Sequence, residues 1–250
     1  MKIIVADDPA AVGGLAGREA ARLIKKAIAA NGQANIILAT GTSQFQTLTQ
    51  LIQEGIDWSK VVMFHLDEYI GLPESSPASF RKYLKERFLA KVPDLTQYYL
   101  VNGEGDAAAE CDRLGKIIKQ HPIDVALVGI GENGHLGFND PPADFETERA
   151  FIVVGLDEDC RKQQFGEGWF DTLAAVPQKA ITMSIKQILK SKHIICSVPD
   201  SRKAVAAKNS LEGPVSNLHP ASILQLHADC VCFLDTASSA LLTTAGYPGF

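Results

Sequence analysis

Hydrophobic positions along this chain follow two patterns that alternate from one segment to the next. In the first, apolar residues recur every three to four positions, as on one face of a helix; in residues 15–30, Ala16 and Leu23 share such a face and Arg18 lies opposite. In the second, four to six apolar residues follow one another without interruption, as in residues 34–39. Such runs are typical of strands that are covered on both faces of a sheet.

The alternation continues along the chain and predicts a complete α/β fold. Helices are expected over residues 15–30, 43–54, 79–89, 107–120 and 202–211, and strands over residues 34–39, 61–65, 98–101, 123–128, 150–154, 180–183, 193–198 and 230–234. Strands of this kind, separated by helices, indicate an open, mostly parallel sheet with helices on both faces, a three-layer Rossmann-like architecture. No linker or internal repeat divides the sequence, so we expect a single domain over residues 1–250.

Composition and charge narrow the function classes. Of the 250 residues, 46% are hydrophobic and 21% are charged, which is typical of a globular protein and excludes extensive disorder. Lys and Arg total 24 against 29 Asp and Glu, a net charge of −5, so the chain lacks the basic excess of a general nucleic-acid binder. A local cluster of cations can still bind a small anion on an acidic protein.

No segment of the sequence indicates export or a membrane span. Asp7 and Asp8 lie where a signal peptide would be apolar, and no apolar run reaches about 18 residues. We therefore expect a cytoplasmic protein that does not bind membranes. Five scattered cysteines without a CxxC pair are expected to be reduced and buried: Cys111, Cys160, Cys196, Cys230 and Cys232.

Ligands of open α/β sheets bind beyond the carboxyl ends of the strands, so the residues just after each predicted strand are the candidates for chemistry. The first such segment is Thr40-Gly41-Thr42-Ser43, which leads directly into a predicted helix. A loop of small and hydroxyl residues at a helix N-terminus can direct N–H and O–H groups at an anion. It is neither a Walker loop nor a GxGxxG motif, so it predicts no nucleotide site, and a plain capping turn is the alternative.

Two adjacent carboxylates, Asp67 and Glu68, follow the strand over residues 61–65. Catalytic bases of α/β enzymes occupy this position, and the aromatic neighbour Tyr69 could exclude water and raise a carboxyl pKa. The alternative is a solvated loop in which Asp67 caps a turn.

A glycine-rich loop follows the strand over residues 123–128 and contains His135. Its four glycines within nine residues suit neither a helix nor a strand, which indicates an unusual loop shape. Histidine titrates near neutral pH, and Asp140 could orient its ring, so we expect His135 to be functional. The histidines elsewhere lack ligand-like spacing to a further His, Cys or carboxylate, and no metal site is expected.

Two cations, Arg202 and Lys203, open the helix after the strand over residues 193–198. Positive charge at a helix N-terminus opposes the helix dipole by about 0.3–1 kcal/mol per charge. A bound phosphate would remove this conflict and accept hydrogen bonds from the free N–H groups, so these residues predict an anion site. A solvated first turn is the alternative.

Four segments together resemble the glucosamine-6-phosphate deaminase/isomerase family, which shares its fold with the 6-phosphogluconolactonases. They are residues 66–71 (LDEYIG), 129–141 (GIGENGHLGFNDP), 176–183 (VPQKAITM) and 211–213 (LEG). The GFNDP continuation of the second segment is closer to the deaminases than to the lactonases. The resemblance extends over nearly the whole chain.

The resemblance implies a reaction and roles for the central residues. Asp67 matches the carboxylate that moves a proton between C1 and C2 of the open-chain sugar phosphate. His135 matches the histidine that assists opening of the pyranose ring, and Asn133 and Asp140 would orient it. The implied reaction converts glucosamine 6-phosphate into fructose 6-phosphate and ammonia through an enolamine, with no metal or organic cofactor.

The remaining candidates belong to phosphate binding or to support of the site. The residues that match the phosphate site are Thr40, Gly41, Ser43 and Lys203, with Thr42 inside the same loop. Glu68 and Gly134 are expected to support the catalytic residues beside them. The arginine that the family carries near the position of Gly168 is absent, and we expect Arg202 to supply that cation.

Departures from the family pattern leave other substrates and functions open. Asp140 stands where Glu is usual and Asn133 where many members have Asp, while Thr42 and Gln44 make the phosphate loop atypical. A related amino-sugar or keto-sugar phosphate is therefore an alternative substrate. A lactonase that activates water with His135, or a non-catalytic sugar-phosphate sensor, would be a different function. The short C-terminus favours a monomer or small homo-oligomer.

Overall fold

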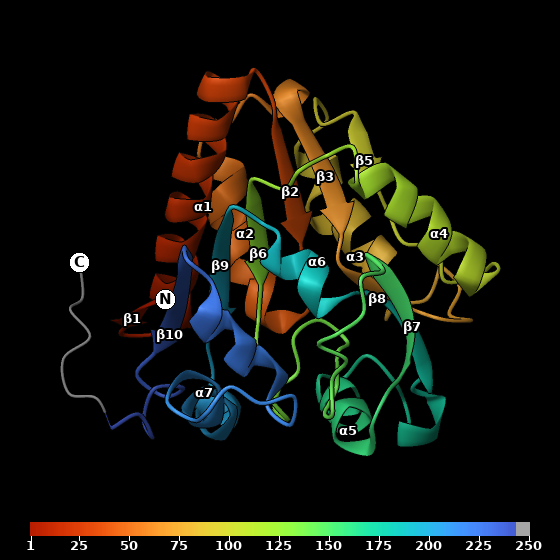
Figure 1. Cartoon of the computed structure of the whole chain (residues 1–250), viewed down its shortest axis with the longest axis vertical. Coiled ribbons are helices and arrows are strands. Elements are labelled where there is room, and N and C mark those ends of the chain that lie inside the picture. The colour runs from red at the N-terminus through yellow and green to blue at the C-terminus, as the bar shows by residue number, and fades with distance from the viewer. Residues whose placement is uncertain (244–250) are drawn as a thin grey trace.

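The computed structural model describes residues 1–243, which build two β-sheets and the helices around them (Figure 1). The larger sheet has seven parallel strands in the order β1-β10-β9-β6-β2-β3-β5. These strands are β1 (Lys2–Ala6), β2 (Ala34–Leu38), β3 (Val61–His65), β5 (Gln97–Tyr99), β6 (Val125–Val128), β9 (His193–Val198) and β10 (Cys230–Asp235). The predicted open parallel sheet is confirmed, with β1 as an unpredicted edge strand whose exposed end weakens its apolar pattern.

The smaller sheet has three antiparallel strands in the order β4-β8-β7. They are β4 (Asp67–Tyr69), β7 (Phe151–Gly155) and β8 (Lys179–Met183). Two predicted strands, residues 150–154 and 180–183, thus lie outside the parallel sheet. The sequence could not show this, because an apolar run does not specify which strand will pair with it. A loop was expected after β3, but residues 67–69 form the strand β4, which pairs with β8. This strand is too short and too polar to show a hydrophobic pattern.

Helices cover both faces of the parallel sheet. One face packs against α1 (Pro9–Asn31), α2 (Phe45–Gln53) and α3 (Phe80–Arg87), and the other against α4 (Ala107–Ile118), α6 (Ile185–Leu189) and α7 (Ala204–Leu211). The unpredicted helix α5 (Glu158–Gly166) packs on the smaller sheet through Cys160. Short 3₁₀ helices are η1 (Thr42–Gln44), η2 (Trp58–Lys60), η3 (Leu89–Lys91), η4 (Leu173–Ala175), η5 (Ser201–Lys203) and η6 (Pro220–Leu226).

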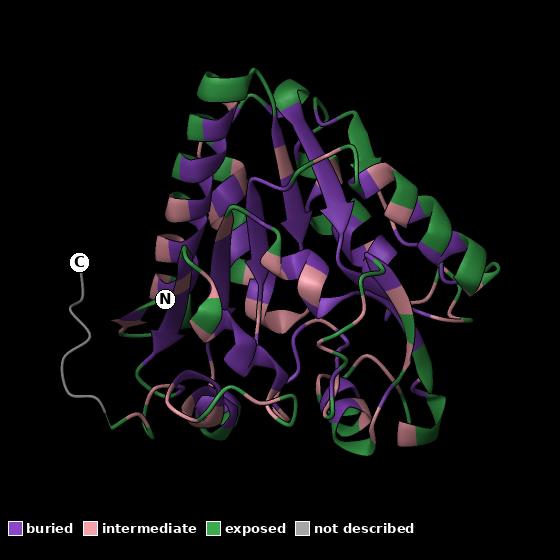
Figure 2. Cartoon of the chain, viewed as in Figure 1, coloured by how far each residue is buried: buried purple, intermediate pink, exposed green. Residues whose placement is uncertain are grey.

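Burial follows the layers of the fold. The strands β2, β3 and β6 are buried along most of their length, while the helices expose their outer faces (Figure 2). All five cysteines are buried and free, as predicted. No helix within residues 1–243 combines the length and apolar composition that a membrane span requires. The C-terminal residues on which the expected oligomeric state depends lie beyond the described part of the chain.

Candidate active site

The candidate site is a pocket at the carboxyl ends of four neighbouring strands, β9, β6, β2 and β3 (Figure 1). Within the parallel sheet, the strand that follows β2 in the sequence is β3, which lies on one side of β2. The strand that follows β6 is β9, which lies on the opposite side, so the strand order reverses between β2 and β6. Ligands of open α/β sheets bind at such a reversal. The hollow measures about 540 Å³ when the part open to solvent is included.

One wall of the pocket combines a loop of small and hydroxyl residues with a buried lysine. Residues 40–43 line it between β2 and α2, and Gly41 has a φ of 95°, a left-handed conformation that side chains rarely adopt. Lys203 reaches the same wall from η5 and is only 6% exposed. Its ammonium forms no hydrogen bond or ion pair with any part of residues 1–243. Burial lowers the pKa of Lys203, and the negative charges of Glu132 and Glu167 oppose that effect.

Arg202 does not join Lys203 in the pocket lining. Its guanidinium Nη2 lies 2.9 Å from Asp200 Oδ2, and Nη1 lies 3.3 Å from Glu132 Oε1. The expectation that Arg202 replaces a missing phosphate-binding arginine is therefore not supported by this geometry. The conflict with the helix dipole is relieved by two carboxylates instead, one from its own turn and one from the glycine-rich loop.

Asp67 lies where the chain passes from the parallel sheet to the antiparallel sheet. Leu66 still donates its N–H to Leu38 of β2, and Asp67 then pairs with Thr182 of β8. Both sheets therefore cover Asp67, which is 5% exposed and lines the pocket. Burial, and secondly the charge of Glu68, raise the pKa of Asp67 to about 8. A carboxyl group with this pKa can both release and accept a proton near neutral pH.

Gly137 leaves the space that Asp67 occupies. A Cβ on Gly137 would lie 3.0 Å from Thr182 Oγ1 and 3.3 Å from Asp67 Oδ2, and the residue has a φ of 60°. A larger residue would be strained in this backbone conformation and would press on the carboxyl group. The glycine-rich loop thus approaches Asp67 closely because Gly137 has no side chain.

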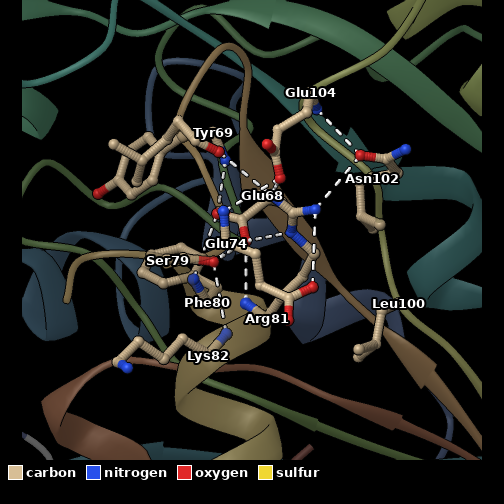
Figure 3. Close-up of polar contacts among 12 residues, drawn as sticks. Glu68, Tyr69, Glu74, Ser79, Phe80, Arg81, Lys82, Leu100, Asn102 and Glu104 are labelled. Atoms are coloured by element: carbon tan, nitrogen blue, oxygen red, sulfur yellow. Dashed lines mark hydrogen bonds and ion pairs between the residues drawn. The ribbon is translucent and has the colours of Figure 1, made fainter. Parts of the chain in front are cut away.

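Glu68 is not among the residues that line the pocket. Its side chain instead links β4 to the N-terminal turn of α3 (Figure 3). Its carboxylate accepts hydrogen bonds from the Ser79 hydroxyl at 2.9 Å and from the Phe80 and Arg81 N–H groups at 3.2 and 2.9 Å. The Arg81 Nε lies 3.2 Å from the same carboxylate, and both side chains are buried. Burial raises the pKa of Glu68, while these hydrogen bonds oppose the rise. Glu68 therefore contacts the backbone of Phe80, a residue that lines the pocket.

The glycine-rich loop holds His135 in the pocket wall. His135 is 7% exposed, and its backbone carbonyl accepts the Gly131 N–H at 2.9 Å. A Cβ on Gly131 would lie 2.2 Å from the His135 ring, so the turn closes over the imidazole only because that side chain is absent. Gly134, with a φ of 86°, donates its N–H to the Gly131 carbonyl and completes the turn. The predicted unusual shape of this loop is confirmed.

Asp140 and Asn133 surround His135 as expected. The His135 Nδ1 lies 3.2 Å from Asp140 Oδ1, within ion-pair distance but out of line for a hydrogen bond. Asn133 accepts the His135 N–H through Oδ1 and donates through Nδ2 to Asp140 and to Asp157. Burial would raise the pKa of Asp140, but His135, the Asp157 N–H and Asn133 outweigh it and lower that pKa. The shorter Asp140 side chain thus still reaches the histidine.

The structure adds pocket residues that the sequence did not reveal. These are Phe80 and Phe138, which form an apolar wall, and Gln163, Gln164 and Glu167 from α5 and its C-terminal end. The helix α5 lacks a clear apolar face, so periodicity could not find it. The run Asp157-Glu158-Asp159 was an available signal, because Asp157 caps the helix by accepting the Cys160 N–H at 2.6 Å.

Cys160 places a thiol beside the histidine and its carboxylate. Ligand atoms of His135, Asp140 and Cys160 all lie within 4.8 Å of one another, a grouping that no sequence spacing predicted. Cys160 itself is fully buried, and burial raises the pKa of its thiol. Within residues 1–243 this is the one group of three His, Cys or acidic side chains whose ligand atoms come this close together.

Known proteins share this sequence and this structure. Residues 7–232 match the model of the family described as glucosamine-6-phosphate isomerases/6-phosphogluconolactonase. A glucosamine-6-phosphate deaminase from Lactococcus lactis subsp. lactis is 37% identical over 246 residues, which cover 97% of this chain and 100% of that protein. Another, from Oenococcus oeni, is 35% identical over 229 residues, covering 91% of this chain and 94% of that protein.

Solved structures agree with the sequence comparison. A monomeric glucosamine-6-phosphate deaminase superposes with a TM-score of 0.87 at 33% identity, over 96% of this chain and 100% of that chain. A 6-phosphogluconolactonase from Shewanella baltica shares the fold with a TM-score of 0.75 at 20% identity, over 94% of this chain and 97% of that chain. With a family model that spans most of its length and relatives above 30% identity, this chain belongs to the glucosamine-6-phosphate isomerase/6-phosphogluconolactonase family.

Proposed function

We propose that this chain converts glucosamine 6-phosphate and water into fructose 6-phosphate and ammonia. The observation that carries the proposal is the pairing, in one pocket, of a buried carboxyl group with a pKa of about 8 and a histidine held by a carboxylate. The relatives at 35–37% identity carry the name glucosamine-6-phosphate deaminase. Site and relatives thus favour the same reaction.

Lys203 and residues 40–43 are suited to the phosphate group of the substrate. The lysine ammonium has no partner within the described chain, although its side chain is buried beside the loop. The loop adds small residues and hydroxyl groups at the start of η1 and α2. A phosphate placed there would receive a charge-assisted hydrogen bond from Lys203 and further ones from the loop.

Asp67 and His135 then divide the proton transfers. His135 moves the proton that must pass from the C1 hydroxyl to the ring oxygen as the pyranose opens. Asp67 removes the proton from C2, which gives an enolamine, and returns a proton to C1. Water adds at C2 of the resulting iminium group, and the C–N bond breaks to release ammonia. Asn133 and Asp140 hold His135 in place through the contacts described above.

A lactonase is the second candidate function, supported by the shared fold of the 6-phosphogluconolactonases. It would use His135 to activate water and would not need Asp67. The buried Asp67 with its raised pKa favours the deaminase, because a proton-transfer base must be deprotonated and reprotonated within one turnover. A sugar-phosphate sensor would need neither residue.

The test is ammonia release from a panel of hexosamine 6-phosphates, with 6-phosphogluconolactone hydrolysis measured on the same preparation. We expect ammonia and fructose 6-phosphate from glucosamine 6-phosphate, and a loss of at least about 10²-fold in kcat for Asp67→Asn. Lactone hydrolysis without ammonia release would assign the chain to the lactonases. Binding of sugar phosphates with neither activity would assign it to the sensors.

We extend the proposal to the setting in which the enzyme works. A small phosphorylated amino sugar is its expected partner, and neither nucleic acid nor a membrane is expected to bind. We propose one catalytic domain over residues 1–250 that acts in the cytoplasm as a monomer or small homo-oligomer. The solved deaminase described as monomeric supports the smallest of these assemblies.

A further inference from the structure

Three different metal-binding side chains meet on the inner side of the catalytic loop. His135 and Asp140 come from the glycine-rich loop, and Cys160 comes from the first turn of α5. Their nitrogen, oxygen and sulfur atoms all lie within 4.8 Å of one another. His135 and Cys160 are buried, and the Asp140 side chain is 5% exposed. The proximity results from the fold, because 20 to 25 residues separate Cys160 from the other two in the sequence.

We propose that His135, Asp140 and Cys160 bind a thiophilic divalent cation, Zn²⁺ or Cd²⁺, and that this cation inhibits the enzyme. Zinc takes imidazole, thiolate and carboxylate ligands in tetrahedral sites, and three protein ligands leave one position for water. Zinc–ligand bonds of about 2.0–2.3 Å require ligand atoms closer together than 4.8 Å, so small side-chain rotations complete the site. On binding, the thiol proton of Cys160 passes to solvent and the sulfur coordinates as thiolate.

The His135 nitrogen supplies the second observation that favours a cation. Its Nδ1 is buried and, although 3.2 Å from Asp140, makes no aligned hydrogen bond there. A cation between the nitrogen and the carboxylate would satisfy both atoms at once. Asn133 and the Asp157 N–H donate to the carboxylate of Asp140, and such outer contacts orient metal ligands.

Inhibition follows from the position of the site. A cation coordinated by His135 and Asp140 removes the contact between them and occupies the histidine that serves ring opening. This part of the inference rests on the proposed function, whereas binding of the cation does not. Soft cations are selected by the thiol, since harder ions such as Mg²⁺ favour sites made of oxygen ligands alone.

The test is a titration of the metal-free full-length protein with Co²⁺ and Cd²⁺, followed through the thiolate-to-metal charge-transfer band. We expect Cys160→Ala to bind one equivalent of metal less than wild type, with affinity at this site at least about 100-fold weaker. Even the loss of a group that only contacts a metal ligand weakens metal binding by about 10–100-fold. His135→Gln should lose the same equivalent. Cys232→Ala is the matched control, because Cys230 and Cys232, with sulfurs 3.9 Å apart, form a separate thiol pair in the core.

Equal binding by wild type and Cys160→Ala, or loss only in Cys232→Ala, would overturn the site.

For inhibition, each protein is compared with its own metal-free rate of ammonia release. We expect Zn²⁺ to inhibit wild type and Cys232→Ala, and Cys160→Ala to require at least about tenfold more metal. Binding without inhibition would overturn the inhibitory role. Failure of all substrates would refute the proposed function alone, because the charge-transfer titration would still report the site.

Discussion

The pH dependence of turnover tests the assignment of Asp67 as the proton-transfer base. Two features of the structure raise the pKa of Asp67 to about 8: its burial between the two sheets and the negative charge of Glu68 beside it. A base must be deprotonated before it can remove the proton from C2. We therefore expect most of the free enzyme to hold a proton on Asp67 below pH 8 and to be inactive, and activity to rise as the pH rises toward 8.

The size of the effect follows from the same pKa. About one tenth of the free enzyme would be deprotonated at pH 7 and about one hundredth at pH 6, so kcat/KM should fall about tenfold per pH unit below 8. The assay is initial-rate ammonia release from glucosamine 6-phosphate across pH 5.5 to 9.5, roughly the range in which protein groups of this kind titrate. The substrate phosphate titrates near pH 6, about two units lower, so the two limbs can be resolved.

Replacing Glu68 tests whether its charge contributes to the raised pKa of Asp67. Glu68→Gln removes the neighbouring negative charge and should move the limb to lower pH. Glu104→Gln is the matched control, because Glu104 also pairs with Arg81, at 2.9 Å, but its side chain is 46% exposed. The limb should stay in place in this control. A kcat/KM independent of pH between 6 and 8 would refute Asp67 as the base. An unmoved limb in Glu68→Gln would refute the contribution assigned to the Glu68 charge and leave burial as the cause of the raised pKa.

Four further substitutions test other parts of the site. Lys203→Met, which keeps an apolar stem, should raise KM for the phosphorylated sugar by about tenfold or more, the loss expected for a charge-assisted hydrogen bond. Arg202→Ala should raise KM less than about threefold. A larger effect of Arg202→Ala than of Lys203→Met would place Arg202 at the phosphate. His135→Gln should reduce turnover of the ring-closed substrate more than that of an open-chain analogue, and equal losses would exclude its role in ring opening. Glu68→Ala should lower the free energy of unfolding by about 3–5 kcal/mol in chemical denaturation, because it removes the buried carboxylate that pairs with Arg81 and accepts hydrogen bonds from Ser79 and Phe80. A loss near that of an exposed ion pair, about 0–1 kcal/mol, would contradict this structural role of Glu68.

The parallel sheet was predictable from the sequence because its central strands are covered on both faces. The segments 34–39 and 123–128 are apolar throughout, and the structure buries β2 and β6 accordingly. The antiparallel sheet was not predictable as a separate unit. Its strand β4 is only three residues long and begins with two carboxylates, so its pairing depends on backbone contacts that no hydrophobic pattern records.

The candidate site divides in the same way. Asp67 and His135 were found because the topology of a parallel sheet brings residues after its strands to one edge, and both line the pocket. The ion pairs of Arg202 with Asp200 and Glu132 could not be predicted, because sequence order does not tell which carboxylates will reach a guanidinium. Glu167 was missed because the helix before it has no apolar face from which to infer its position.

The junction between the two sheets explains why one carboxyl group can serve as both base and acid. At pH 7 a pKa of about 8 favours the protonated form of Asp67 by only about 1.4 kcal/mol, so taking a proton from C2 and returning one to C1 are both accessible. A carboxyl group at the end of a strand in a single open sheet would be exposed on one side and would keep a pKa near 4. Here Asp67 pairs with Thr182 of β8 and is 5% exposed, and Glu68 next to it accepts the Arg81 N–H of α3. The burial of Asp67 at this junction and the charge of Glu68 beside it would thus place the proposed proton transfer near neutral pH.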